Sequence, residues 1–148
     1  FLRIGLILSA IPEAKIIHTK RDPAATCWSN FKHYFADKGL GYSFDIKDTL
    51  HFYKLYQDLM AFWNDLYEDR IYNLDYDLLT VDQEVETKRL INHLGLNWEE
   101  ACLSPHKNGR SVSTASQQQV REKVYARSSQ AWRKFEPFLN GAFDELCP

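Results

Sequence analysis

The alternation of apolar and polar segments gives its clearest signal near the start of the chain. A β-branched segment at 15–20 predicts a short buried strand. Asp22 and Pro23 follow it and predict a helix over 23–36, because aspartate accepts hydrogen bonds from free N–H groups and proline suits the first helical position. Arg21 is therefore expected at the carboxyl end of a strand and beside a helix N-terminus, where α/β sheets bind phosphates.

The rest of the pattern predicts more helices and a second strand. Apolar periodicity predicts three further helices, at 2–10, 46–67 and 81–94. Asp82 is a suitable N-cap for the last of these helices, and Gly95 is a suitable stop. The segment 38–41 predicts a flexible loop, and alternation at 70–75 predicts the second strand. We therefore expect an α/β chain with two short parallel strands, flanked by helices that dominate the structure.

Composition narrows the classes of function. The 148 residues are enough for one domain, and their net charge of −2 argues against nucleic acid or a membrane surface as the main partner. No apolar run reaches the roughly 18 residues of a membrane span. Cys27, Cys102 and Cys147 are far apart and match neither a metal site nor a disulfide framework. A reducing, cytoplasmic compartment and a site without metal are the expectations.

Two motifs resemble those of a known family. Arg21-Asp22-Pro23 followed by Ser29 resembles the 3′-phosphate-binding motif of sulfotransferases that use 3′-phosphoadenosine 5′-phosphosulfate. In that family the arginine and the serine hold the 3′-phosphate of the donor. Tyr76 precedes an acidic residue and a leucine, as does the family's tyrosine that contacts the nucleotide. Without the family, the first motif also fits a capped helix with a surface arginine, and the tyrosine also fits a structural role.

The closing segment carries the most distinctive similarity. It is similar to the end of the bacterial and tyrosylprotein-type sulfotransferases at a series of positions: Thr114-Ala115-Ser116, Val120-Arg121, Tyr125, Ser128 and Trp132-Arg133-Lys134. It departs from them at Lys123, where many members have proline. The resemblance implies six donor-binding residues: Arg21, Ser29, Tyr76, Ser116, Arg121 and Ser128. On composition alone, the polar stretch from 106 to 116 also fits a linker.

The resemblance also implies a fold and an activity. The family fold is a P-loop-nucleotide-transferase-like parallel sheet with flanking helices, and residues 1–148 resemble its carboxyl-terminal, mostly helical part. The family's glycine-rich phosphosulfate loop is expected upstream, since the six glycines here are scattered. The implied reaction transfers a sulfuryl group to a hydroxyl or amine acceptor, and this fragment alone is expected to be inactive. A tyrosylprotein-type relative would work in a Golgi-type lumen instead of the cytoplasm.

Catalytic residues stay unassigned, because the family's base comes from segments near or before the start of this chain. His18 is interpreted as a core or supporting histidine. The alternative function is a non-catalytic helical interaction or scaffold domain that retains the sulfotransferase fold. A P-loop kinase is disfavoured, because the sequence has neither an arginine-bearing lid nor a metal-binding aspartate at a strand end. The acceptor is not specified by the sequence.

Overall fold

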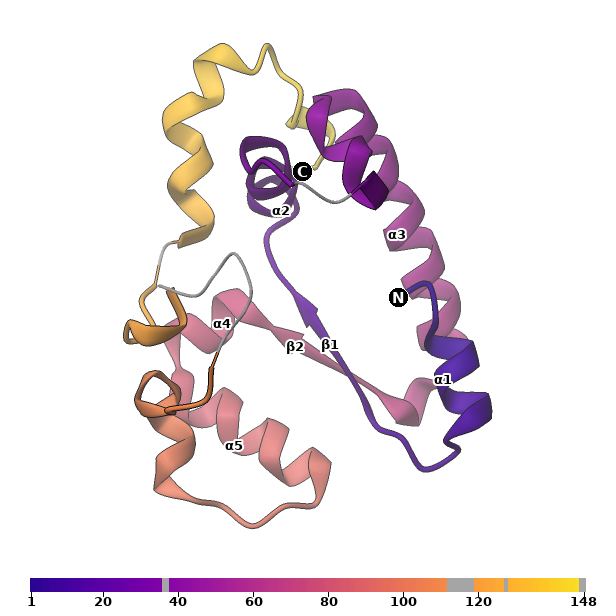
Figure 1. The fold of residues 1–148 in the computed structure, drawn as a ribbon, viewed down its shortest axis with the longest axis vertical. Coiled ribbons are helices and arrows are strands. Elements are labelled where there is room, and N and C mark those ends of the chain that lie inside the picture. The colour runs from indigo at the N-terminus through magenta and orange to yellow at the C-terminus, as the bar shows by residue number, and fades with distance from the viewer. Residues whose placement is uncertain (36–37, 112–118, 127, 147–148) are drawn as a thin grey trace.

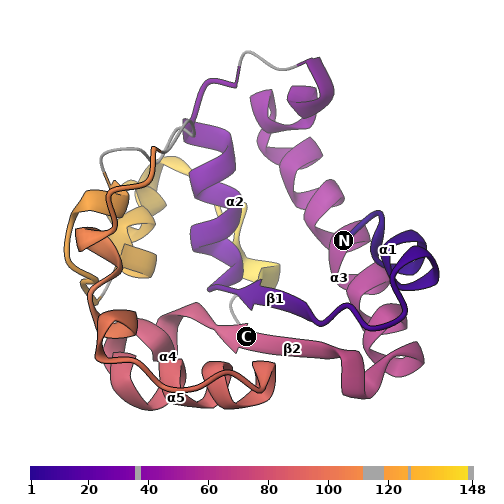
Figure 2. The ribbon, with the colours of Figure 1, turned by 60° about the horizontal axis from the view of Figure 1, so that its bottom comes forward.

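A computed structural model describes residues 1–35, 38–111, 119–126 and 128–146. Two parallel strands form a small sheet at its centre. Strand β1 (Ile16–Lys20) pairs with β2 (Ile71–Asp75), and His18 lies opposite Asn73 in the register. The predicted parallel pair is therefore confirmed. Figure 2 shows the strands between α2 and α3 on one side and α4 and α5 on the other.

Helices account for most of the described chain, as predicted. The α-helices are α1 (Ile4–Ala10), α2 (Pro23–Lys32), α3 (Ile46–Leu66), α4 (Tyr76–Val81) and α5 (Gln83–Leu94) (Figure 1). Short 3-10 segments join or follow them: η1 (Lys38–Phe44), η2 (Glu68–Arg70), η3 (Glu100–Leu103), η4 (Pro105–Lys107), η5 (Gln119–Arg121), η6 (Ser128–Phe138) and η7 (Asp144–Leu146). In the described segments, no helix has both the length and the apolar character needed to cross a membrane.

Capping side chains determine where the helices begin. Asp22 Oδ1 accepts from the backbone N–H of Ala25 at 2.6 Å, with Pro23 at the first helical position of α2. Asp82 caps α5 in the same way, and Gly95 ends it at φ 72°, a left-handed conformation that favours glycine. These starts and stops agree with the sequence prediction, because capping depends on neighbouring residues alone.

Three local expectations need correction. Helix α2 ends at Lys32 and not at 36, because the backbone becomes extended at His33. The expected loop at 38–41 forms part of the 3-10 segment η1. The alternating pattern after the second strand hides helix α4, which begins where the Asp75 side chain accepts from the backbone N–H of Leu78 at 3.0 Å.

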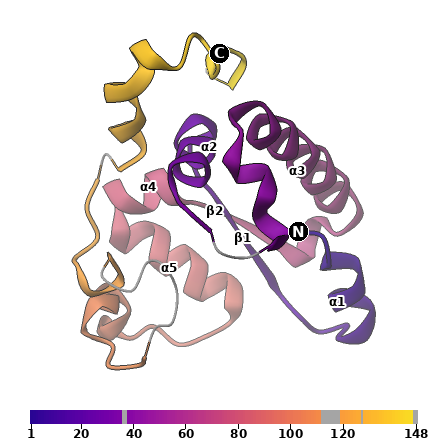
Figure 3. The ribbon, with the colours of Figure 1, turned by 45° about the horizontal axis from the view of Figure 1, so that its top comes forward.

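Buried side chains form two small hydrophobic clusters among the described residues. The first cluster joins α2 to the C-terminal segment, which runs beside α2 in Figure 3; its members are Ala24, Ala25, Cys27, Trp132, Phe143 and Leu146. The second joins α1 to α3 and β2 through Ile4, Leu8, Met60 and Ile71. The small residues of α2 let the rings of the C-terminal segment approach closely. Residues more than 100 positions apart therefore meet beside the end of β1.

Candidate functional site

The turn after β1 holds Arg21 in place from both sides. The backbone N–H of Asp22 donates to Asp77 Oδ2 at 2.8 Å, which ties this turn to the start of α4. The Asp22 carboxylate is itself occupied as the N-cap of α2. Both hydrogen bonds fix the backbone on which the Arg21 side chain stands, at the carboxyl ends of the two strands.

The contacts of the Arg21 guanidinium orient the group but do not use all of its hydrogen-bond donors. Its Nε donates to Ser129 Oγ at 2.9 Å, and its central carbon lies 5.6 Å from the centroid of the Tyr76 ring. Its two terminal nitrogens have no hydrogen-bond partner among the described residues. An arginine held at Nε presents the rest of its planar fork to a ligand, and this geometry suits phosphate oxygens.

Arg21 lines a pocket of about 270 Å³, which we call the Arg21 pocket. The pocket is built from the turn after β1, one face of α2, the start of α4 and residues from 125–126 and 128–132. Its lining residues are Arg21, Ala25, Trp28, Ser29, Lys32, Tyr76, Tyr125, Ala126, Ser128, Ala131 and Trp132. On α2, residues 25, 28, 29 and 32 share one face because they are three or four positions apart.

The charged side chains in the lining of the Arg21 pocket are positive. Arg21 and Lys32 contribute two cations, and the lining includes no carboxylate among the described residues. Lys32 forms no ion pair within that part of the chain. Hydroxyl groups from serine and tyrosine add neutral donors. Two cations with hydroxyls and no carboxylate in the described lining are groups that suit an anion such as phosphate.

Aromatic rings supply the rest of the pocket wall. Trp28 stacks on Phe135 with the ring centroids 4.7 Å apart and the planes inclined by 29°. Tyr76, Tyr125 and Trp132 contribute further rings to the lining. Planar apolar surfaces next to an anion-binding patch suit a ligand with both a phosphate and a flat base.

Four of the six predicted donor-binding residues meet in this pocket: Arg21, Ser29, Tyr76 and Ser128. Arg121 lies elsewhere, and its terminal nitrogens donate to the backbone carbonyls of Asn108 and Arg110. Ser116 falls outside the described residues. The structure thus places four predicted residues together and separates Arg121 from them, while the binding role of all six stays a prediction.

The sequence interpretation did not single out one aromatic and one charged residue of α2 that line the pocket. Trp28 and Lys32 lie on the same helix as Ser29, and Lys32 is one turn beyond it. Helical spacing from Ser29 was a sufficient signal for Lys32. Trp132 belongs to the closing motif but was not assigned to the donor site, because its contact with α2 depends on tertiary packing.

A second pocket of about 610 Å³, lined mostly by residues with polar groups, lies on the α3 side of the strand ends and shares Arg21 with the first. A chain of side-chain hydrogen bonds runs along it. Tyr56 Oη and His18 Nε2 are 2.5 Å apart, His18 Nδ1 and Asn73 Oδ1 are 2.7 Å apart, and Asn73 Nδ2 donates to Asn64 Oδ1 at 2.9 Å. Since Asn73 Oδ1 only accepts, Nδ1 carries the His18 proton and Nε2 accepts from Tyr56. Burial is the main cause that lowers the pKa of His18 below 6.5, with the Asn73 hydrogen bond acting against it.

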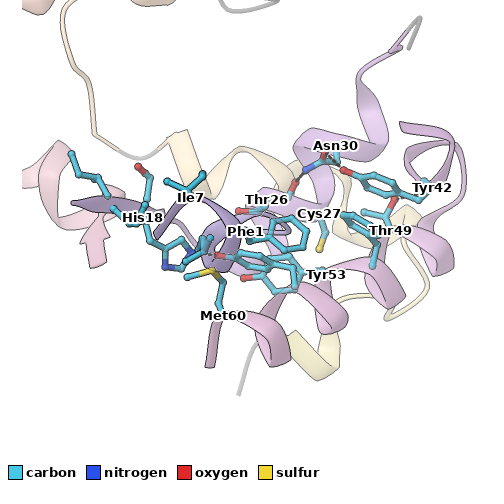
Figure 4. A pocket seen from close by; sticks show the side chains of 16 residues that line it. Phe1, Ile7, His18, Thr26, Cys27, Asn30, Tyr42, Thr49, Tyr53 and Met60 are labelled. Atoms are coloured by element: carbon cyan, nitrogen blue, oxygen red, sulfur yellow. Dashed lines mark hydrogen bonds between the residues drawn. The ribbon is translucent and has the colours of Figure 1, made fainter. Parts of the chain in front are cut away.

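A third pocket, of about 400 Å³, is mostly apolar and lies among α1, β1, α2 and α3. Figure 4 shows His18, Cys27, Tyr53 and Met60 around it. Burial, with a smaller effect of Asp22, raises the pKa of Cys27 to about 12, so its thiol stays protonated at neutral pH. Over the described ranges, no group of three or more His, Cys, Asp or Glu side chains could hold a metal ion.

Comparison with known protein families shows which family the chain belongs to. The model of the sulfotransferase family matches residues 1–100, which include Arg21, Ser29 and Tyr76. The chain belongs to the sulfotransferase family. The resemblance inferred from the strand, the turn and the following helix is therefore confirmed, and the membership supports a transferase. Ser128 and Trp132 lie beyond the matched part of this sulfotransferase chain.

A relative extends the similarity over almost the whole chain. An uncharacterized protein of Aquifex aeolicus (strain VF5) is 36% identical over 145 residues, which cover 97% of this chain. The same match covers 19% of the length of that protein. The sulfotransferase chain therefore spans about a fifth of this relative.

Proposed function

We propose that the chain forms the nucleotide-binding part of a sulfotransferase that uses 3′-phosphoadenosine 5′-phosphosulfate, within a P-loop-like parallel sheet. The observation that carries the proposal is the Arg21 pocket, where two cations and several hydroxyls converge at the carboxyl end of β1 without an opposing carboxylate. Membership of the sulfotransferase family supports the same donor. The acceptor is a hydroxyl or amine compound.

Each part of the pocket has a role in this proposal. The Arg21 fork binds oxygens of the 3′-phosphate, Ser29 and Ser128 donate to the same group, and Lys32 adds charge. The aromatic wall faces the adenine and the ribose. Sulfuryl transfer resembles phosphoryl transfer in that positioning and charge stabilisation dominate over covalent chemistry. By fixing the 3′-phosphate, these residues hold the donor in one orientation.

Titration calorimetry on the intact protein tests the proposal with two ligands, 3′-phosphoadenosine 5′-phosphate and AMP. The ligands differ only in the 3′-phosphate. A charge-assisted hydrogen bond contributes about 1.5–3 kcal/mol, so we expect the first ligand to bind at least about tenfold more tightly. A non-catalytic scaffold domain without the site would bind both ligands weakly and alike. Equal affinities would therefore refute a 3′-phosphate site.

A further inference from the structure

Trp132 has a polar atom that the packing of the protein does not explain. The residue is only 4% exposed, and its indole Nε1 has no hydrogen-bond partner within the described parts of the chain. Leaving a buried donor unpaired is unfavourable, and buried tryptophan N–H groups usually find an acceptor. An unpaired donor of this kind calls for an explanation in each structure where it occurs.

Hydrophobic packing accounts for the ring but not for its nitrogen. Trp132 meets Phe143 edge to face, with the centroids 5.5 Å apart and the planes at 83°. The Arg133 guanidinium carbon lies 5.1 Å from the centroid of the Trp132 ring. A phenylalanine would retain the apolar burial without introducing an unpaired N–H. The nitrogen is therefore a candidate for a contact made with a bound molecule.

The position of Trp132 places it beside the anion-binding groups. Ser129, which accepts from Arg21, precedes Trp132 by three residues in the 3-10 segment η6. Side chains three residues apart in a 3-10 helix lie on the same side. Both residues are 4% exposed, and Trp132 itself lines the Arg21 pocket. The orphan donor thus belongs to a ring that shares the pocket with Arg21.

We propose that the Trp132 N–H donates to an oxygen of the phosphate bound in the Arg21 pocket, so that Trp132 helps to select nucleotides with a 3′-phosphate. This inference rests on the proposed function. A phosphate is the favoured acceptor because Arg21 and Lys32 make the pocket positive, and because its oxygens accept more hydrogen bonds than one arginine and two serines supply. Trp132 is a specificity residue in this account and takes no part in the transfer step.

Trp132→Phe tests the inference, because it keeps the aromatic packing and removes the donor. Affinities for 3′-phosphoadenosine 5′-phosphate and for AMP are measured by calorimetry in the intact protein. We expect a loss of about tenfold or more for the first ligand and less than about twofold for AMP. The matched control is Trp98→Phe, which removes the indole N–H of a tryptophan outside the Arg21 pocket and should leave the ratio of the two affinities unchanged. The free protein should unfold at an unchanged or higher temperature, since an unpaired buried donor has been removed.

Indole N–H resonances of the wild-type protein give a readout that needs no stable variant. The chain contains four tryptophans, and the Trp132 signal should shift downfield and exchange more slowly when 3′-phosphoadenosine 5′-phosphate is added, but not when AMP is added. If the wild type prefers the 3′-phosphate while Trp132→Phe keeps that preference, the donor is satisfied by other means and the inference is wrong. If the wild type shows no preference, both the 3′-phosphate site and the role of Trp132 are refuted.

Discussion

Removal of the Arg21 guanidinium is the most direct perturbation of the candidate site. In Arg21→Ala the pocket keeps Lys32 and the hydroxyls but loses the fork whose terminal nitrogens are unpaired among the described residues. Loss of one charge-assisted hydrogen bond to phosphate weakens binding by about 1.5–3 kcal/mol, or roughly 10- to 150-fold. Affinity for AMP should change far less, because AMP has no 3′-phosphate.

Part of the affinity lost in Arg21→Ala comes from removing a hydrogen bond within the protein. This part can be measured separately from the lost contact with phosphate. The bond from Arg21 Nε to Ser129 Oγ joins two segments separated by 108 positions, and a hydrogen bond of this kind contributes about 0.5–1.5 kcal/mol to stability. A double-mutant cycle of Arg21→Ala with Ser129→Ala measures how far Ser129 orients the guanidinium. Arg21→Lys should recover little affinity, because lysine keeps the charge but has neither the Nε donor nor the planar fork.

The control for this series is Lys54→Ala, which also removes one positive charge. Lys54 pairs with Glu145 and does not line the Arg21 pocket. Calorimetry should therefore show wild-type discrimination between 3′-phosphoadenosine 5′-phosphate and AMP in this variant. If Arg21→Ala is folded as judged by circular dichroism and still discriminates between the two nucleotides as the wild type does, Arg21 does not bind the 3′-phosphate.

Two further predictions follow from the pKa directions of buried groups. Because the folded-state pKa of His18 is lowered, the unfolded chain takes up this proton first as the pH falls below 6.5, so the free energy of unfolding decreases from pH 7 down through the folded-state pKa. Urea titrations at a series of pH values should show that the free energy of unfolding decreases less with falling pH in His18→Gln than in the wild type. The same pH dependence in both proteins would contradict this prediction. The Cys27 thiol, with its pKa raised to about 12, should react with a thiol reagent at pH 8 only as fast as the protein opens; prompt labelling of Cys27 in the folded protein would contradict its burial.

The elements that the sequence predicted well are those determined by neighbouring residues. The start of α2 at Pro23 and the bounds of α5 follow from caps that lie within a few residues of the helix ends. Helix α4 was missed because Tyr76, Asp77 and Leu78 continue the apolar–polar alternation of the strand. Its start depends on a side-chain cap at Asp75, a residue that the pattern assigned to the strand.

The residues of the candidate site also divide into those that local sequence predicts and those that depend on tertiary packing. Arg21 and Ser29 were predictable because one strand, one turn and one helix position both residues. Arg121 was assigned from its charge and its place in a motif, and neither of these specifies which acceptors are near; in the structure it donates to two backbone carbonyls. The contact of Arg21 with Ser129 depends on how the C-terminal segment packs, which no local pattern specifies.

The pocket and the first hydrophobic cluster share their structural elements, which links binding to folding. Ala25 belongs to the cluster and also lines the Arg21 pocket, and the same is true of Trp132. An anion held between α2 and η6 would add interactions across the contact that the cluster forms. A ligand that binds only this docked arrangement stabilises it by an amount set by ligand concentration and affinity. The C-terminal segment is therefore both a wall of the proposed site and a part of the core, and changes that loosen its packing on α2 should weaken binding even where they touch no ligand.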